Sequence, residues 1–268
     1  MRPEPAPAGE RKHWRRYVAL GDSLTEGLCD PGPDGALRGW ADRLALLLAA
    51  REPLDYANLA IRSKRVEDVC GTQLQRALEL RPDLASILVG ANDLVKRRAS
   101  IPRLAARLED AVRQLREAGA DVLVVTAFLP GNPAARIYAR RFSAWATALA
   151  GIARRQGAIL LDTDLHPQLA ERPNWGEDLV HLSSRGHRFL AYRAGGVLGV
   201  ALADELGALD EALHASERTG AGVWWRRHAL PWVWRRLHGR AAGDGRSAKH
   251  HDYVRLGRER GVREPSEV

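Results

Sequence analysis

The chain has 268 residues, of which 45% are hydrophobic, which is enough for one sizeable domain with a buried core. No stretch approaches the ~20 uninterrupted apolar residues of a membrane-spanning helix, and the basic N-terminus lacks the apolar run of a secretory signal. The net charge of +8 is uneven: residues 215–268 hold 12 Lys and Arg against 6 Asp and Glu, which leaves 29 against 27 for residues 1–214.

The chain begins with a Pro-rich extension, residues 1–14, that we expect to be disordered, followed by a folded domain over residues 15–214. The first buried strand, residues 17–20, runs into Gly21-Asp22-Ser23. Ligands of open α/β sheets bind outside the carboxyl ends of the strands, which favours Ser23 as a nucleophile. Asp and Ser also commonly cap helices, so this stretch alone leaves both roles open.

The rest of the domain alternates between predicted strands and helices. Further strands are predicted at residues 54–59, 84–89, 121–128 and 158–161, and helices at residues 40–50, 66–80, 102–118, from about 134 to 156, and from 183 to about 214. This alternation indicates a mostly five-stranded parallel sheet between two layers of helices. Right-handed crossovers then place all the carboxyl ends of the strands at one edge of the sheet.

That edge carries the residue types that an acyl-transfer reaction needs. Serine is a weak nucleophile without an adjacent base, and His181 could supply one. Asp178, three residues earlier, could orient the imidazole and stabilise its charged form. The backbone N–H of Ser23, the side-chain amide of Asn92 and a backbone N–H near Ser63 are candidate donors to the developing oxyanion.

Each of these residues also has a simpler interpretation when it is taken alone. His181 could be a surface histidine, and Asn92 could form a turn. Asp22, Asp178, His181 and His187 lack a recognised metal-ligand spacing, so we expect no metal and no organic cofactor. Cys29 and Cys70 are expected to be packing residues of a protein in a reducing compartment. The common location of the polar residues at one sheet edge favours the catalytic interpretation.

Three blocks of the sequence resemble the SGNH hydrolases, also called GDSL-type esterases and lipases. They are Gly21-Asp22-Ser23-Leu24, Gly90-Ala91-Asn92-Asp93 and Asp178-Leu179-Val180-His181, in order within residues 16–200. The resemblance implies a flavodoxin-like α/β/α sandwich with Ser23 as nucleophile, His181 as base and Asp178 as its orienting acid. It also implies an oxyanion hole made by Ser23, Asn92 and a loop residue.

That loop residue is the one departure from the family pattern. The family normally has a glycine there, and Ser63 occupies the matching position in this chain. A serine N–H can serve as the donor only if the backbone angles that the glycine adopts are open to a residue with a Cβ atom.

The basic C-terminal tail, residues 215–268, has a different composition from the domain. Residues 223–237 hold four of the eight tryptophans, interleaved with arginines. We favour packing of these tryptophans on the domain, with an anionic membrane surface as the second interpretation and single-stranded nucleic acid as the least favoured. Residues 239–268 are polar and are expected to be disordered.

Together these features predict a cytoplasmic serine hydrolase that cleaves a small-molecule or lipid-like carboxylic ester through an acyl-enzyme on Ser23. A thioesterase, a lysophospholipase or an acyltransferase would use the same residues. A weakly active protein that binds through its Trp/Arg-rich tail is the alternative from outside the enzymes. Contact with the membrane through residues 223–237 would make the protein peripheral at the inner membrane surface.

Overall fold

The structure is a computed structural model that describes residues 13–32, 35–50, 52–201, 203–207, 243 and 245–257. The predictions for the N-terminal extension up to residue 12 and for the Trp/Arg-rich residues 223–237 fall outside these ranges. No helix in the described ranges is both long enough and apolar enough to cross a membrane.

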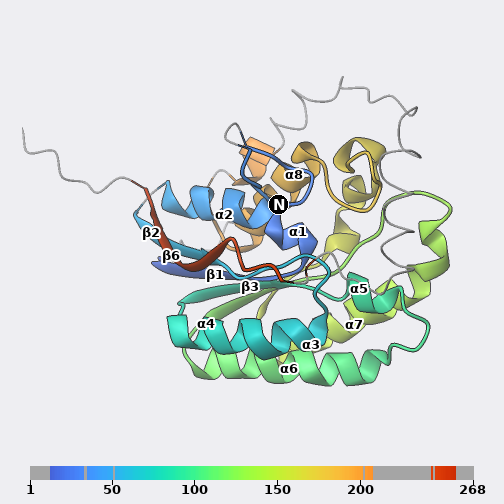
Figure 1. The fold of residues 1–268 in the computed structure, drawn as a ribbon, viewed down its shortest axis with the longest axis horizontal. Helices are drawn as coiled ribbons and strands as arrows, with labels where there is room; N and C mark the ends of the chain where they lie inside the picture. Colours follow the sequence, from blue (N-terminus) through green and yellow to red (C-terminus); the bar gives the residue numbers. More distant parts are fainter. Residues whose placement is uncertain are drawn as a thin grey trace, which may run out of the picture.

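A six-stranded sheet with the strand order β5-β4-β3-β1-β2-β6 forms the centre of the molecule (Figure 1). Its five parallel strands confirm the prediction, and β6 is an addition that pairs antiparallel with β2. All five residues of β3 are buried, as expected for an apolar strand covered on both faces. The strands are β1 (Arg16–Gly21), β2 (Leu54–Asn58), β3 (Leu84–Leu88), β4 (Asp121–Val125), β5 (Ile159–Leu161) and β6 (His250–Leu256).

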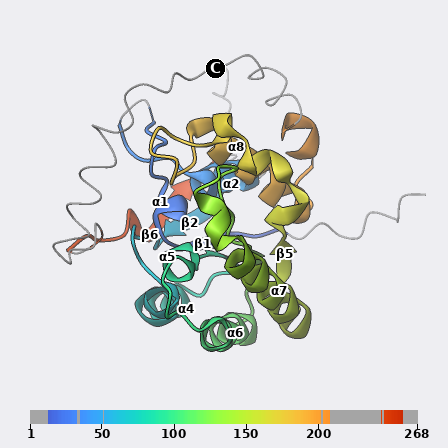
Figure 2. The same cartoon turned by 90° about the vertical axis from the view of Figure 1, so that its right-hand side faces the viewer.

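Helices cover both faces of the sheet and complete the predicted sandwich. Figures 1 and 2 show α3, α4, α6 and α7 on one face and α1, α2 and α8 on the other. Each layer has its own apolar core against the sheet. The helices are α1 (Ser23–Glu26), α2 (Trp40–Ala49), α3 (Val66–Asp68), α4 (Leu74–Leu80), α5 (Ala91–Leu94), α6 (Ile101–Glu117), α7 (Ala139–Gln156) and α8 (Ser184–Val197).

The helix predicted over residues 66–80 contains an irregularity. A π-helical turn, Val69–Gln73, lies between α3 and α4. This turn directs the buried Gln73 toward β1, where its side-chain amide exchanges two hydrogen bonds of 2.9 Å with the backbone N–H and C=O of Gly21. Such turns occur frequently at functional sites, and here the turn fixes the backbone two residues before Ser23.

The helix predicted to run from residue 183 to about residue 214 is shorter than expected. It ends at Val197, and Gly199 adopts a positive φ of 71° that stops it. Residues 203–207 are helical again, and the remainder of the prediction lies outside the described ranges.

The disorder predicted for residues 239–268 is wrong for the segment that forms β6. This strand pairs with β2 through contacts such as Leu54 with Leu256 and Tyr56 with Val254. The Tyr253 hydroxyl also donates a hydrogen bond to the carbonyl of Leu80. The free edge of β2 supplies backbone partners for the strand, which the composition of a polar segment does not reveal. The sheet therefore extends beyond the domain boundary placed at residue 214.

Candidate active site

Ser23 lies where β1 ends and α1 begins, at the carboxyl edge of the sheet. The Asp22 carboxylate caps α1 by accepting a hydrogen bond of 3.2 Å from the backbone N–H of Leu24. The Ser23 hydroxyl lies 2.9 Å from His181 Nε2. The two roles left open by the sequence are therefore divided, because Asp22 is the cap and Ser23 faces the imidazole.

His181 is held between Ser23 and Asp178. Its Nδ1 lies 2.6 Å from Asp178 Oδ2, so the N–H donated to this carboxylate leaves Nε2 free to accept a proton from Ser23. Asp178 Oδ1 accepts the backbone N–H groups of Val180 and His181, each at 3.0 Å. Burial tends to raise the pKa of Asp178, but the hydrogen bonds and the charge of His181 outweigh it and lower that pKa to about 2. The carboxylate is therefore ionised at neutral pH.

The loop that carries this pair is a closed turn anchored at both ends. Trp175 and Leu182 form an isolated antiparallel bridge, and the N–H of Gly176 donates to the carbonyl of His181 at 2.8 Å. Leu179 has a positive φ of 54°, which turns the chain back within three residues. This geometry explains how a spacing of three residues brings the carboxylate to the imidazole.

Ser63 and Asn92, the other two predicted oxyanion donors, lie in neighbouring loops. The Asn92 amide donates one hydrogen bond to Asp22 Oδ2 at 3.1 Å and another to the carbonyl of Lys64 at 3.0 Å. Ser63 has a φ of 66°, so the serine adopts a left-handed conformation that favours glycine. The structure thus brings Asn92 and the Ser63 loop to the edge where Ser23 lies, with both amide protons of Asn92 already donated.

Asp22 is a buried carboxyl beside the proposed nucleophile, with 3% of its surface exposed. Burial is the main cause that raises its pKa from 3.8 to about 7, against the opposing hydrogen bonds from Leu24 and Asn92. The charge of this group therefore changes close to neutral pH, next to the amide of Asn92.

Sequence reasoning missed a second buried acid at the site, Glu26. Its carboxylate accepts the backbone N–H of Arg62 at 2.6 Å and forms an ion pair with the Arg62 guanidinium. Arg62 directly precedes Ser63, so this pair fixes the loop of the third candidate donor. The two partners are 36 residues apart, and no local pattern in the sequence connects them.

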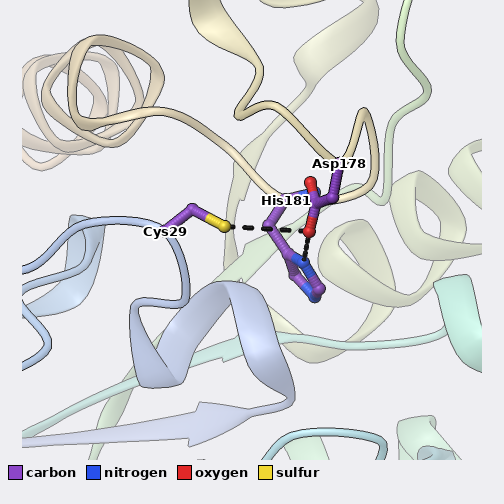
Figure 3. A group of neighbouring side chains, drawn as sticks. All are labelled: Cys29, Asp178 and His181. Atoms are coloured by element: carbon purple, nitrogen blue, oxygen red, sulfur yellow. Dashed lines mark hydrogen bonds and ion pairs between the residues drawn. The ribbon is translucent and has the colours of Figure 1, made fainter. Parts of the chain in front are cut away.

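Cys29 is exposed and is therefore not the packing residue that the sequence suggested, whereas Cys70 is buried in the core. Figure 3 shows the Cys29 thiol directed at Asp178, with Sγ 3.7 Å from Oδ2. Within the described ranges, Cys29, Asp178 and His181 form the one group of three His, Cys, Asp or Glu side chains whose potential metal-ligating atoms all lie within 4.8 Å of one another.

His187, which belonged to the alternative metal set, is fully buried elsewhere in the fold. Its Nδ1 accepts the backbone N–H of Trp40 at 3.2 Å, and its Nε2 lies 3.0 Å from the carbonyl of Leu28. Both ring nitrogens therefore have backbone hydrogen-bond partners near the start of α2. Burial of the imidazole lowers the pKa of His187 to about 4.

Comparison with known proteins connects this geometry to a family. Residues 19–189 match the model of the GDSL-like Lipase/Acylhydrolase family, and no curated protein sequence matches the chain. Among solved structures, the acetylxylan esterase Axe2 from Geobacillus stearothermophilus has 20% identity over 69% of this chain and 94% of its own, with a TM-score of 0.56.

Two further solved structures have the same fold. TesA has 22% identity over 69% of this chain and 98% of its own, with a TM-score of 0.58. LAE5, a hydrolase from the metagenome of Lake Arreo in Spain, has 19% identity over 69% of this chain and 95% of its own, with a TM-score of 0.59. The family match covers well over half of the chain and contains Ser23, Ser63, Asn92, Asp178 and His181. The chain therefore belongs to the GDSL-like lipase/acylhydrolase family and is an ester hydrolase.

Proposed function

We propose that the protein hydrolyses carboxylic esters through an acyl-enzyme on Ser23. The observation that carries this proposal is the continuous chain of contacts from Ser23 Oγ to His181 Nε2, at 2.9 Å, and from His181 Nδ1 to Asp178 Oδ2, at 2.6 Å. As Ser23 attacks the ester carbonyl, His181 takes its proton, and Asp178 stabilises the resulting imidazolium. His181 then returns the proton to the departing alkoxide.

The negative charge on the carbonyl oxygen needs donors that already point at it. The backbone N–H groups of Ser23 and Ser63 and the amide of Asn92 are the candidates. Both N–H groups of Asn92 are donated to protein acceptors. Asn92 would therefore release one acceptor, or share a proton, when the oxyanion forms. A single donor of this type contributes about 3 kcal/mol to lowering the barrier.

The second half of the reaction uses the same groups in reverse. A water molecule gives its proton to His181, attacks the acyl carbon and releases the acid, while Ser23 recovers its proton. All proton transfers in this cycle pass through His181 Nε2, so the proposal requires neither a metal ion nor an organic cofactor.

The test is hydrolysis of a short-chain p-nitrophenyl ester by the wild type and by Ser23→Ala. We expect Ser23→Ala to reduce the rate to the background level, whereas Ser143→Ala, on the exposed surface of α7, keeps the wild-type rate. A fluorophosphonate should label Ser23, located by peptide mapping. Equal rates in Ser23→Ala and wild type, or a label on another residue, would refute the proposal.

The acyl-enzyme could also form from a thioester or a lysophospholipid, or pass its acyl group to an alcohol. Axe2 is described as an acetylxylan esterase, and its likeness to this chain supports the fold and leaves the substrate open. Product analysis with competing alcohols separates transfer from hydrolysis, because an acyltransferase gives a new ester and a hydrolase gives the free acid.

We also propose that the protein is cytoplasmic and, as the second interpretation of residues 223–237 after packing of their tryptophans on the domain, that this segment reaches an anionic membrane surface. The support is compositional: indole rings suit the headgroup region and guanidinium groups attract anionic lipid. Sedimentation with anionic and neutral vesicles tests this, using the full chain and a variant with its four tryptophans in this segment changed to alanine. Equal sedimentation of the two proteins with anionic vesicles would refute it.

A further inference from the structure

The described C-terminal residues, 243 and 245–257, lie beyond the family match at residues 19–189 but belong to the same folded body. Figure 1 shows β6 beside β2, and their register places His250 opposite Asn58, near the carboxyl end of β2. The residue before β6, Lys249, therefore enters the molecule on the side of the sheet edge where Ser23 lies.

The ammonium group of Lys249 is surrounded by hydrogen-bond acceptors. Its side chain is 16% exposed, and its ammonium group donates to three acceptors. These are the carbonyl of Glu26 at 3.1 Å, the carbonyl of Leu37 at 2.8 Å and the carboxylate of Asp42 at 2.6 Å. An ammonium has three protons to donate, so each has a partner at hydrogen-bonding distance.

The three acceptors belong to the segments that hold the nucleophile helix. Glu26 is the last residue of α1, which begins at Ser23, and Leu37 lies in the loop that leads to α2. Asp42 lies in the first turn of α2, where it also accepts the N–H of Gly39 and the hydroxyl of Tyr56. Lys249 thus joins the end of the nucleophile helix to the beginning of the next helix.

The end of α1 and the beginning of α2 are tightly packed against each other. A Cβ atom on Gly39 would lie 2.6 Å from the Cα atom of Gly27, so the exit from α1 and the entry to α2 are in backbone contact. A one-turn helix such as α1 has little stability of its own. Its position therefore depends on this contact and on the bonds that Lys249 makes across it.

The same C-terminal segment also reaches the Ser63 loop. Glu26, whose carbonyl Lys249 holds, uses its carboxylate to hold Arg62. In addition, Gly243 packs on this loop so closely that a Cβ atom there would lie 2.1 Å from the carbonyl oxygen of Arg62. The segment therefore supports the loop of the third candidate donor by two routes.

We propose that Lys249 is a positioning residue that fixes α1 and, through Glu26, the Ser63 loop, so that the C-terminal strand is a working part of the active site. This inference rests on the proposed function, because it assigns a role to Lys249 in the geometry of attack by Ser23. The hydrogen bonds of Lys249 are made to Glu26, Leu37 and Asp42, so its effect on Ser23 is transmitted through the backbone of α1.

The test compares Lys249→Met, which keeps the length and loses the three donors, with Lys249→Arg and with Arg255→Met. Arg255 lies in β6 and pairs with the partly exposed Asp55, so its replacement controls for a general effect on the strand. The maximal rate with a p-nitrophenyl ester is divided by the amount of serine that a fluorophosphonate titrates at completion, which gives kcat per titrated serine, and KM is taken from the same saturation curve. This correction removes any loss that is due only to unfolded protein.

We expect Lys249→Met to lower kcat per titrated serine by about 10-fold to 100-fold, since a misplacement on the order of 1 Å can cost that much. KM should change by less than about 3-fold on the same reasoning, and fluorophosphonate should react more slowly by a similar factor to kcat. Lys249→Arg, which keeps the charge and N–H donors, should recover part of the loss. Arg255→Met should match the wild type.

A wild-type kcat per titrated serine in Lys249→Met would overturn the positioning role. Gly243→Ala is the second variant, which is needed if Lys249→Met does not fold. It should displace the carbonyl of Arg62 and lower kcat per titrated serine, and an unchanged value would also count against the inference. If the wild type and Ser23→Ala have equal rates, the proposed function fails instead, so the two failures are distinguishable.

Discussion

The replacement Asp22→Asn should change how the stability of the protein depends on pH. Folding buries this carboxyl and raises its pKa from 3.8 to about 7. At a pH between these two pKa values, the Asp22 carboxyl is ionised in the unfolded chain but still protonated in the folded protein. The free energy of unfolding contributed by Asp22 therefore falls as the pH rises from about 4 to 7, and it stays low above pH 7.

The size of the effect follows from the separation of the two pKa values. Each pH unit between them corresponds to about 1.36 kcal/mol, so the change from 3.8 to about 7 amounts to about 4 kcal/mol. An asparagine does not titrate, and its carbonyl oxygen can still accept the N–H of Leu24. Its amide cannot serve as an acceptor for Asn92, which adds a constant cost on the order of 1 kcal/mol at every pH.

The assay is urea unfolding followed by tryptophan fluorescence at pH 4.5, 6 and 8, for the wild type and for Asp22→Asn. The difference between the two proteins is the relevant quantity, because the buried His187, with its pKa lowered to about 4 by burial, titrates in the same window with the opposite sign. Between pH 4.5 and 8 this difference should move in favour of Asp22→Asn by about 3 kcal/mol. Asp164→Asn, on the exposed surface, is the matched control. A difference that is independent of pH would refute the reasoning, because Asp22 would then be ionised in the folded protein throughout.

Three further predictions concern the site itself. Asp178→Asn should lower kcat by about 1,000-fold to 10,000-fold with little change in the circular dichroism spectrum, because the imidazole loses its orienting carboxylate; a loss of less than about 10-fold would contradict the role. Ser63→Gly should relieve about 1 to 2 kcal/mol of strain in the left-handed backbone of this residue, whereas the greater entropy of glycine in the unfolded chain should cost about 0.4 to 1 kcal/mol. The urea midpoint of Ser63→Gly should therefore equal or exceed that of the wild type. A clearly lower midpoint would count against strain at this residue. Partial burial and the neighbouring Asp178 raise the pKa of the Cys29 thiol to about 12, so a methanethiosulfonate reagent should inactivate the wild type slowly at neutral pH and faster as the pH rises, by adding bulk beside Asp178. Cys29→Ser should resist, and inactivation of both proteins at the same rate would contradict this.

Much of the fold follows from local patterns that the sequence displays directly. The run at residues 84–89 is apolar on both faces, which is typical of a central parallel strand, and β3 occupies that position with every residue buried. Pro102, Gly119 and the apolar spacing between them likewise delimit α6, where Leu108, Val112 and Leu115 are buried. The common edge of the strands then follows from the handedness of the crossovers, so the meeting of Ser23 with the loop of Asp178 and His181 could be predicted.

Contacts between distant parts of the chain could not be predicted in this way. Gln73 contacts Gly21 from the end of a π-helical turn, and Gly71 within Val69–Gln73 weakens a helix without predicting that type of turn. The strand β6 depends on the unpaired edge of β2, which exists only after the sheet has formed. Lys249 looks like one more residue of a basic tail until the fold surrounds its ammonium group with three acceptors.

These long-range contacts also explain how Ser63 keeps its left-handed backbone conformation. A non-glycine residue keeps a left-handed conformation only where the surrounding structure holds it there. Both neighbours of Ser63 are held: Arg62 by the carboxylate of Glu26, and Lys64 through its carbonyl, which accepts the amide of Asn92. The φ of 66° is thus fixed from outside the loop. Lys249 in turn donates a hydrogen bond to the carbonyl of Glu26, so the positioning role proposed for Lys249 extends from α1 to the Ser63 loop.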